Sequence, residues 1–424
     1  MQPIFKEQIK MWSDLGYPLP ITEGKYWYDN HFVCAFTPDG RLHKLYKYRV
    51  FDDLSIEIKP YAKAPIDWQD CHFETWSETA ERERERMQII VQSANQKVKN
   101  VLAQFPDHKK VLFNSTGKDS MVTLDIVQKS LPDIKVYFNN TSIDVADTYR
   151  MVKAHADWII LNPDIGFYQY CKENHFIPTR FSRGCCTTFK EGKSIEYFDD
   201  EPQMLFFMGV RNDESNTRAD REDISHNPKW GNRDWYSSLP IREFSEFDVW
   251  LYILDNDIEI NPKYRKGYSR VGCSVCCPYY TKYTWVLDKY WFPIQYKRWR
   301  DFLRKDFTQE QRWTKLNCTT NEYVNEAWCG GLFRPEPTDE VICEFMTYKG
   351  VNNKSVAQQY FNKTCTECGK NIRQYDVIGM NLKLSGRLAE NLYCKKHLQA
   401  KLGISNEQWK NMVEDFKAQG CTLF

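Results

Sequence analysis

The 424-residue sequence lacks any run of about 18 apolar residues, the length that a helix needs to cross a membrane. Its first residues, MQPIFKEQIKMW, also lack the apolar segment of a secretion signal. We therefore expect a cytoplasmic protein that does not span a membrane. The net charge is only +1, so any site for a polyanion must come from a local group of basic residues. The chain shows no internal repeat and no low-complexity tract.

Short apolar runs alternate with helical patterns in the middle of the chain. The runs have strand length and are VLFNST, KVYFNNT, WIILNP and MLFFMGV. The stretches between them, DSMVTLDIVQKS, VADTYRMVKAHA and GFYQYCKENHF, are typical of helices. This alternation predicts an α/β fold with a doubly wound, mostly parallel sheet. Such sheets bind ligands at the carboxyl ends of their strands.

The pattern divides the chain into four predicted parts. Residues 1–73 form an appended N-terminal α+β domain, with strand-like stretches such as KYWYDNHFVCAF and LHKLYKYRVF. Residues 74–280 form a nucleotide-binding domain that opens with one long amphipathic helix over 74–105. Residues 281–335 form an aromatic and basic helical extension. Residues 336–424 form a linker and a metal-binding domain.

A phosphate-binding loop is predicted where VLFNST runs into Gly117-Lys-Asp-Ser and a helix. Gly117 lets the backbone approach a ligand, and the first turn of the helix offers free amides and a favourable dipole. Lys118 can neutralise phosphate oxygens, and Ser115 and Ser120 can donate hydrogen bonds. Asp119 stands where a Walker A loop needs serine or threonine, so this is a different kind of loop. The alternative is an ordinary strand–turn–helix junction.

At this point the sequence resembles a known family. Residues 114–120, NSTGKDS, are similar to the SGGKDS loop of the PP-loop ATP pyrophosphatases, and specifically of the phosphoadenylyl-sulfate (PAPS) reductase superfamily. Three later stretches resemble the family's other motifs in the same order: residues 139–149, residues 209–218 and residues 240–276. The resemblance covers about residues 108–280. It implies an adenine nucleotide alpha-hydrolase-like fold that binds ATP or a related adenosine nucleotide, with Mg²⁺ as a candidate companion ion.

The resemblance also implies roles for individual residues. Four side chains are implied in catalysis or in binding the anionic tail: Lys118, Asp119, Arg211 and Arg218. The others that would contact or order the nucleotide are Ser115, Thr116, Gly117, Ser120, Glu214 and Ser215. Thr116 stands where the family carries glycine, and threonine adopts a positive φ only with strain. Without the resemblance, the segment GVRNDESNTRADRED equally describes a charged surface helix, and Arg221 is the weakest candidate in it.

The first cysteine set combines Cys185 and Cys186 with Cys273 and Cys276. Two adjacent thiolates cannot easily reach one tetrahedral zinc ion, but they can bind different corners of a [4Fe–4S] cluster. The arrangement resembles the cluster motif of the iron–sulfur members of the family. Zinc and uncoordinated core thiols are the alternatives, and Cys277 is an alternative to Cys276. In the absence of a secretion signal, disulfides are the weaker explanation for 15 cysteines.

The second set has the spacing of a treble-clef zinc site: Cys365, Cys368, Cys394 and His397. Three thiolates and one imidazole complete a tetrahedral Zn²⁺ site and leave no open position for catalysis. We therefore predict a structural zinc ion, which a domain of about sixty residues needs for stability. The alternative is two unrelated pairs in a small core.

These features predict an enzyme that adenylates an acceptor oxygen, releases pyrophosphate and uses the cluster to position or deliver sulfur. The relatives with both loop and cluster include the sulfur-inserting protein of bacterial DNA phosphorothioation systems. Residues 263–315 hold 13 Lys/Arg against 4 Asp/Glu among many aromatic side chains, so DNA or RNA is a candidate acceptor; the alternative is one helix with a charged outer face that packs around the cluster. A sulfur-donor protein is a further candidate partner. The alternatives are a sulfonucleotide reductase with Cys421 as its nucleophile, and a non-catalytic nucleotide-binding module of a larger complex.

Overall fold

The structure is a computed structural model, and it consists of two compact units. It describes residues 1–51, 53–65, 68–174, 176–178, 184–214, 222–226, 230–274, 281–309, 363–385 and 391–418, together with Thr320 and Val324. The first unit comprises Met1–Asn174 and Cys185–Lys297, and the second comprises His175–Gly184 and Arg298–Phe424.

The N-terminal part of the first unit is a five-stranded antiparallel sheet with one helix, α1 (Lys6–Asp14). Its strands follow one another in chain order: β1 (Gln2–Pro3), β2 (Tyr26–Asp29), β3 (Phe32–Phe36), β4 (Leu42–Val50) and β5 (Ile56–Pro60). The strands predicted in KYWYDNHFVCAF and LHKLYKYRVF are therefore present. A two-residue turn, Asn30-His31, joins β2 to β3 with φ of 42° and 72°, values that match the right-handed twist of a hairpin.

The helix predicted over residues 74–105 is wrong in one respect, because two helices occupy this stretch. They are α2 (Trp76–Arg82) and α3 (Arg84–Gln104), which meet at Glu83. Thr75 and Glu78 form a capping box that starts α2. α2 contacts α10 (Glu246–Asp255), whereas α3 contacts α4 (Lys118–Gln128). Since the two segments pack on different neighbours, the chain turns between them.

The central sheet has six strands in the order β10-β11-β9-β6-β7-β8. The four predicted strands are present as β6 (Lys109–Phe113), β7 (Lys135–Asn139), β8 (Ile159–Leu161) and β9 (Gln203–Met208). The sequence did not predict β11 (Asp234–Ser238), which is parallel to β9, or β10 (Ile224–Ser225), which is antiparallel to β11. All other neighbours are parallel, so the sheet is mostly parallel as predicted.

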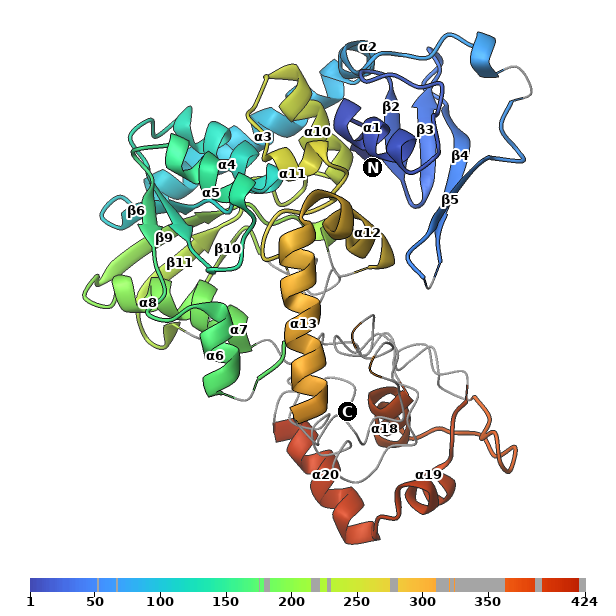
Figure 1. Cartoon of the computed structure of the whole chain (residues 1–424). Helices are drawn as coiled ribbons and strands as arrows, with labels where there is room; N and C mark the ends of the chain where they lie inside the picture. The colour runs from blue at the N-terminus through green and yellow to red at the C-terminus, as the bar shows by residue number, and fades with distance from the viewer. Residues whose placement is uncertain are drawn as a thin grey trace. The chain divides into compact units, whose positions relative to one another are not determined.

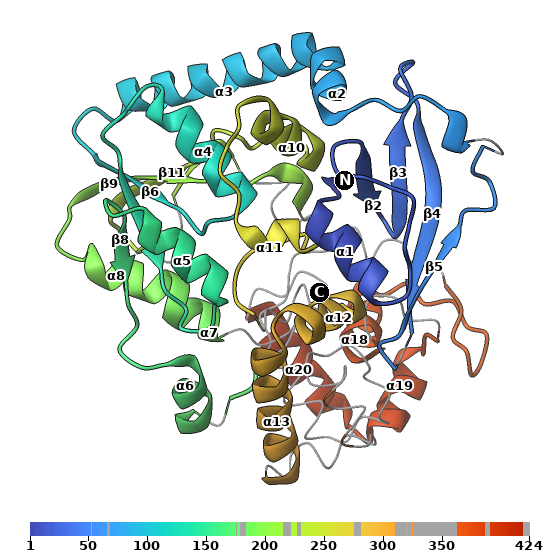
Figure 2. The same ribbon diagram turned by 45° about the horizontal axis from the view of Figure 1, so that its top comes forward.

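Side chains alternate between the two faces of this sheet, and both faces are buried. Leu112, Phe138 and Phe207 pack with α3, α4, α5 (Ala146–Ala154) and α10 on one face. Val111 and Phe206 belong to a second cluster with Phe198 and Trp230 on the other face. This coverage agrees with the predicted doubly wound α/β fold. Figure 2 shows α3 lying along the outside of the α4–α10 layer.

The chain order reverses beside β6, because β7 lies on one side of it and β9 on the other. Such a reversal opens a crevice at the carboxyl ends of the strands. Figure 1 shows α10 and α11 (Pro262–Arg265) between the central sheet and the N-terminal sheet. The described part of this unit also contains α6 (Phe167–Glu173), α8 (Lys193–Tyr197) and α12 (Lys282–Trp291), and α7 (Gly184–Cys186) begins one residue before its second segment.

Helix α13 (Pro293–Gln309) spans the boundary between the units. The described part of the second unit contains α18 (Tyr375–Ser385), α19 (Lys395–Leu402) and α20 (Asn406–Ala418). Their apolar faces share a small core that includes Ile378, Leu398 and Trp409. No helix in the described part of the chain combines the length and the apolar character that crossing a membrane requires.

Candidate functional site

The loop between β6 and α4 is held by hydrogen bonds to Thr116. This residue is fully buried and has φ of 59°, so the position where the sequence departs from the family's glycine does take the strained conformation. Its amide donates to Asn114 Oδ1 at 2.8 Å, and its Oγ1 accepts from Asn261 Nδ2 at 2.8 Å. Asn261 Nδ2 also donates to Thr148 Oγ1 at 3.0 Å. These contacts hold the loop in place despite the strain.

Gly117 contributes space rather than an unusual φ. It has φ of −74° and precedes the first residue of α4. A Cβ atom there would lie 3.2 Å from Ser115 Oγ and 3.6 Å from Tyr264 Oη. The Lys118 amide donates to Tyr264 Oη at 2.8 Å, whereas the Gly117 amide donates to no described residue. The Gly117 amide is therefore open to a ligand at this point.

Lys118 is 2 % exposed and lies among carboxylates. Its Nζ is 3.3 Å from Asp119 Oδ2 and 3.4 Å from Glu246 Oε1. Burial opposes the charge, but Asp119, Tyr264 and Glu246 raise the pKa of Lys118 above its usual value. Burial likewise opposes ionisation of Asp119, while Lys118 and Arg211 hold the pKa of that carboxyl below its usual range. Both groups are therefore ionised at neutral pH.

The segment after β9 brings a second cation to the same place. Arg211 is 3 % exposed and pairs with Asp119 and with Asp213, and its amide donates to Glu214 Oε1 at 3.1 Å. Glu214 in turn pairs with Arg270. A Cβ atom on Gly209 would lie 2.6 Å from the Asp119 carbonyl, so only glycine allows the segment after β9 to pack this closely against the first turn of α4.

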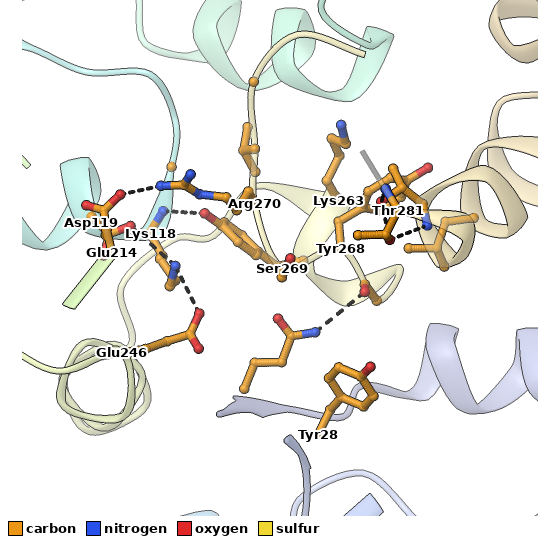
Figure 3. A pocket seen from close by; sticks show the side chains of 18 of the residues that line it. Tyr28, Lys118, Asp119, Glu214, Glu246, Lys263, Tyr268, Ser269, Arg270 and Thr281 are labelled. Carbon is orange, nitrogen blue, oxygen red and sulfur yellow. Dashed lines mark hydrogen bonds and ion pairs between the residues drawn. The ribbon is translucent and has the colours of Figure 1, made fainter. Parts of the chain in front are cut away.

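These groups line a cavity of about 610 Å³, a size within the usual range for small-molecule sites. Figure 3 shows Lys118, Asp119, Glu214 and Glu246 at one side of it, and Tyr268 and Thr281 at the other. The N-terminal sheet contributes to the lining as well, through residues that include Tyr28, Asn30, His31 and Tyr48. The cavity therefore belongs jointly to the central domain and the appended domain.

The structure brings together most of the predicted nucleotide-binding residues. Those that line the cavity are Ser115, Gly117, Lys118, Asp119, Ser120 and Glu214. Thr116 and Arg211 lie directly behind them through the contacts described above. Ser215, Arg218 and Arg221 lie outside the described residues. Sequence reasoning did not single out Glu246, Tyr264, Lys263 or Arg270, although all four fall within the family-like stretch 240–276.

The first cysteine set is only partly described, since Cys276 and Cys277 lie outside the described residues. Cys273 lines the cavity. Cys185 and Cys186 are half-buried in α7, which continues into a π-helical turn, Thr187–Gly192. Lys190 in that turn lines the same cavity. The [4Fe–4S] assignment remains a prediction.

The second cysteine set forms one compact group. The candidate ligand atoms of Cys365, Cys368, Cys394 and His397 all lie within 4.8 Å of one another. His397 Nδ1 is 3.4 Å from the Sγ atoms of Cys365 and Cys394, and the Cys368 and Cys394 Sγ atoms are 3.9 Å apart. A tetrahedral zinc ion with Zn–S of about 2.3 Å needs ligand separations of roughly 3.5–3.8 Å. The four residues therefore fit a zinc ion.

Local structure explains how the second set forms. Gly369, with φ of 66°, closes a turn in which its amide donates to the Cys365 carbonyl at 2.8 Å. Cys394 immediately precedes α19, so His397 falls in the first turn of that helix. Asn381, fully buried in α18, donates to the Tyr393 carbonyl at 2.9 Å and accepts from the Tyr393 amide at 2.8 Å. It thereby fixes the backbone next to Cys394.

Comparison with known proteins points to one family. The model of the phosphoadenosine phosphosulfate reductase domain matches residues 109–278. An uncharacterised protein of Methanocaldococcus jannaschii is 31% identical over 215 residues, which are 49% of this chain and 44% of that protein. The matched region thus spans less than half the length of that relative.

Two proteins with named activities are also similar. An adenosine 5′-phosphosulfate reductase of Salinibacter ruber is 23% identical over 166 residues, which are 38% of this chain and 64% of that protein. The crystal structure of a PAPS reductase from Candida auris, a phosphate complex, matches with a TM-score of 0.35 and 16% identity, over 45% of this chain and 94% of that one. The family match spans the β6–α4 loop and the parallel strands of the central sheet, and over this region the chain is similar to the PAPS reductase superfamily.

Proposed function

We propose that the chain is a PAPS-reductase-like enzyme that binds an adenosine nucleotide in the 610 Å³ cavity, with the phosphate tail at the β6–α4 loop. The observation that carries this proposal is the position of Lys118. A buried, ionised ammonium lies at the start of a helix, beside the open Gly117 amide and the Ser115 and Ser120 hydroxyls, all of which line one cavity. A helix N-terminus with a neighbouring lysine suits phosphate oxygens.

With ATP as substrate, the enzyme would adenylate an acceptor. An acceptor oxygen attacks the α-phosphorus, the bond from that phosphorus to the bridging oxygen breaks, and pyrophosphate leaves with the electron pair. Lys118 and the Gly117 amide would stabilise the charge that develops on the leaving phosphates. Arg211, held by Asp119 and Asp213, would keep Asp119 ionised and in place.

The charge balance of the loop end favours a magnesium complex of the nucleotide as substrate. Lys118, Arg211 and Arg270 each already pair with a carboxylate of the chain. These pairs leave little net positive charge to offset a triphosphate. A Mg²⁺ ion that arrives with the nucleotide would supply it.

The [4Fe–4S] cluster is part of the proposal, and one of its candidate ligands, Cys273, lines the cavity. Cys186 directly precedes the π-helical turn Thr187–Gly192, which contains the cavity-lining Lys190. Cys185 and Cys276 would complete the ligand set. Such a cluster would position or deliver sulfur for transfer to an acceptor, for which DNA or RNA and a sulfur-donor protein are the proposed partners. The zinc ion of the second unit would have a structural role.

The second candidate is a sulfonucleotide reductase, which the names of the similar APS and PAPS reductases favour. In that reaction a thiolate attacks the sulfur of the phosphosulfate and the nucleotide phosphate leaves. A second thiol must then release sulfite. The candidate nucleophile, Cys421, lies outside the described residues.

The test uses the full chain purified without oxygen. Lys118→Met should weaken ATP binding roughly 10- to 100-fold in calorimetry, since a charge-assisted contact is lost. Lys109→Met is the matched control, because Lys109 begins β6 at the opposite edge of the sheet and pairs with Glu201. Equal ATP affinity for Lys118→Met and the parent protein would refute the proposed site.

The two chemistries are separated by their products. Pyrophosphate release from ATP in the presence of an acceptor supports adenylation, whereas sulfite release from APS or PAPS with added thiol supports reduction. Tight nucleotide binding without either product would identify a non-catalytic module. Metal analysis of the same sample should give about four iron atoms and one zinc ion per chain if both metal assignments are correct.

A further inference from the structure

Lys263 in α11 is a buried lysine that lines the cavity. It is 4 % exposed, and among the described residues no carboxylate forms an ion pair with it. Its contact is with an aromatic ring, since its Nζ lies 4.4 Å from the centre of the Tyr268 ring. Figure 3 shows its ammonium group apart from the carboxylates at the Lys118 side.

Lys118 and Arg270 also line the cavity, but each of them pairs with a carboxylate. Lys118 pairs with Asp119 and Glu246, and Arg270 pairs with Glu214. A buried charge without a partner is costly, because a ring contact replaces only part of the lost hydration. Residues that break such a rule are expected at sites where a ligand completes the environment.

The backbone around Lys263 is firmly held, so its side chain starts from a fixed point. The Lys263 amide donates to Asn261 Oδ1 at 3.0 Å, and the Lys263 carbonyl accepts from the Lys266 amide at 3.1 Å. Asn261 is also the residue that donates to Thr116 in the phosphate loop. The position of Lys263 is therefore tied to that of the loop.

Two further carboxylates that line the cavity, Asp288 and Asp29, have other contacts. Asp288 accepts from Tyr268 Oη at 2.6 Å, and Asp29 lies in β2, 3.9 Å from the Met1 amino group. The wall also carries the hydroxyls of Thr281 and Thr284, and Thr281 caps the N-terminus of α12. A helix N-terminus and a buried ammonium that line one cavity both favour an anion.

We propose that Lys263 forms a second oxyanion subsite of the cavity, which holds a phosphate-type group other than the one at the Lys118 loop. This inference rests on the proposed function, since it assumes that an adenosine nucleotide occupies the cavity. The group belongs either to the second substrate or to another position of the nucleotide itself. In both cases the ammonium supplies binding and orientation, and no bond to Lys263 is formed.

The experiment measures binding to the full chain by calorimetry, with Lys263→Met and Lys263→Arg compared with the parent. The first titration adds inorganic phosphate or pyrophosphate to protein saturated with AMP. The second compares AMP with adenosine 3′,5′-bisphosphate. In one of the two titrations, Lys263→Met should bind the added phosphate-type group roughly 10- to 100-fold more weakly than the parent does. Its affinity for AMP alone should be unchanged, and Lys263→Arg should keep most of the parent's affinity.

The outcomes separate the subsite from the nucleotide site. A loss in the first titration assigns the group to a second substrate, and a loss in the second assigns it to the nucleotide. Unchanged affinities in both overturn the subsite but not the proposed function, which fails instead if the parent binds no nucleotide. Without ligand, the melting temperature of Lys263→Met should be no lower than that of the parent. If Lys263→Met does not fold, Lys263→Gln is used in the same titrations.

Discussion

The left-handed conformation of Thr116 gives a prediction that depends on the loop geometry alone. A residue with a Cβ atom at φ of 59° costs roughly 1–2 kcal/mol relative to glycine. Thr148 is the matched control, because it is also fully buried and accepts a hydrogen bond from the same Asn261 amide, yet lies in the ordinary helix α5. The perturbation is replacement of each threonine by alanine and by glycine.

The expected difference in stability between the alanine and glycine variants can be compared between the two sites, because the same kind of hydrogen bond is lost at each. At either site both variants lose a hydrogen bond, worth about 1 kcal/mol, so this loss cancels between alanine and glycine. At Thr148 alanine should be more stable than glycine by about 1 kcal/mol, the usual preference in a helix. At Thr116 that preference should disappear or reverse, because glycine relieves the backbone strain. The two glycine-minus-alanine differences should therefore differ by about 1–2 kcal/mol.

The assay is urea unfolding of the four variants followed by tryptophan fluorescence, with the free energy of unfolding taken from midpoints at a common slope. Nucleotide binding to Thr116→Gly should stay close to that of the parent protein, because the family loop carries glycine there. If alanine is favoured over glycine by the same amount at both sites, Thr116 does not have a positive φ and the loop described here is wrong.

Three further predictions concern packing, pH and metal. Gly209→Ala should destabilise the fold by roughly 2 kcal/mol or more and weaken nucleotide binding, since its Cβ would meet the Asp119 backbone at 2.6 Å; Gly166→Ala, with 3.9 Å of space, should be nearly neutral in the same melts. The fold lowers the pKa of Asp119, so the ionised carboxylate stabilises the fold at pH values above its ordinary pKa of 3.8. This stabilisation is lost as the pH falls through the pKa of the folded state. Asp119→Asn should therefore flatten this part of the curve of melting temperature against pH. Cys368→Ser should lower the zinc content and the helicity of the second unit.

Each of these predictions has an outcome that would contradict it. Equal melting temperatures for the two glycine variants would mean that Gly209 does not approach α4 closely. An unchanged acid limb in Asp119→Asn would mean that this carboxylate is not held ionised by its neighbours. Full zinc content in Cys368→Ser would remove Cys368 from the ligand set.

The central strands and the loop between β6 and α4 could be predicted from the sequence for a physical reason. Strands buried on both faces, such as β6 and β9, carry continuous apolar runs that stand out from the helices between them. The loop lies where such a run meets Gly117 and Lys118. The second cysteine set was visible because the spacing of its residues is set by one turn and one helix start. Local rules determine all three features.

Other features depend on contacts between distant segments. Strand β11, DWYSS, contains no apolar run, so its parallel pairing with β9 was not evident. The turn at Glu83 reflects two different packing partners, and nothing in the sequence breaks the helix there. Lys263 is one of 13 basic residues in its segment, and only the fold shows that it is buried without an acidic partner. Asn30 and His31 line the cavity, and this likewise depends on how the two sheets pack.

The ion pairs of the loop end show how the site is prepared before any nucleotide binds. Lys118 and Arg211 are almost completely buried, and water cannot orient them, so their carboxylate partners fix both their charge and their position. Under the proposed function, a phosphate that enters would meet cations already held in place and would lose little free energy in ordering them. Among the described residues Lys263 has no such partner, so under the proposal its charge would be available to a ligand. The two ends of the cavity therefore differ: at one end the cations already pair with carboxylates, and at the other an anion would supply the partner that the described residues do not.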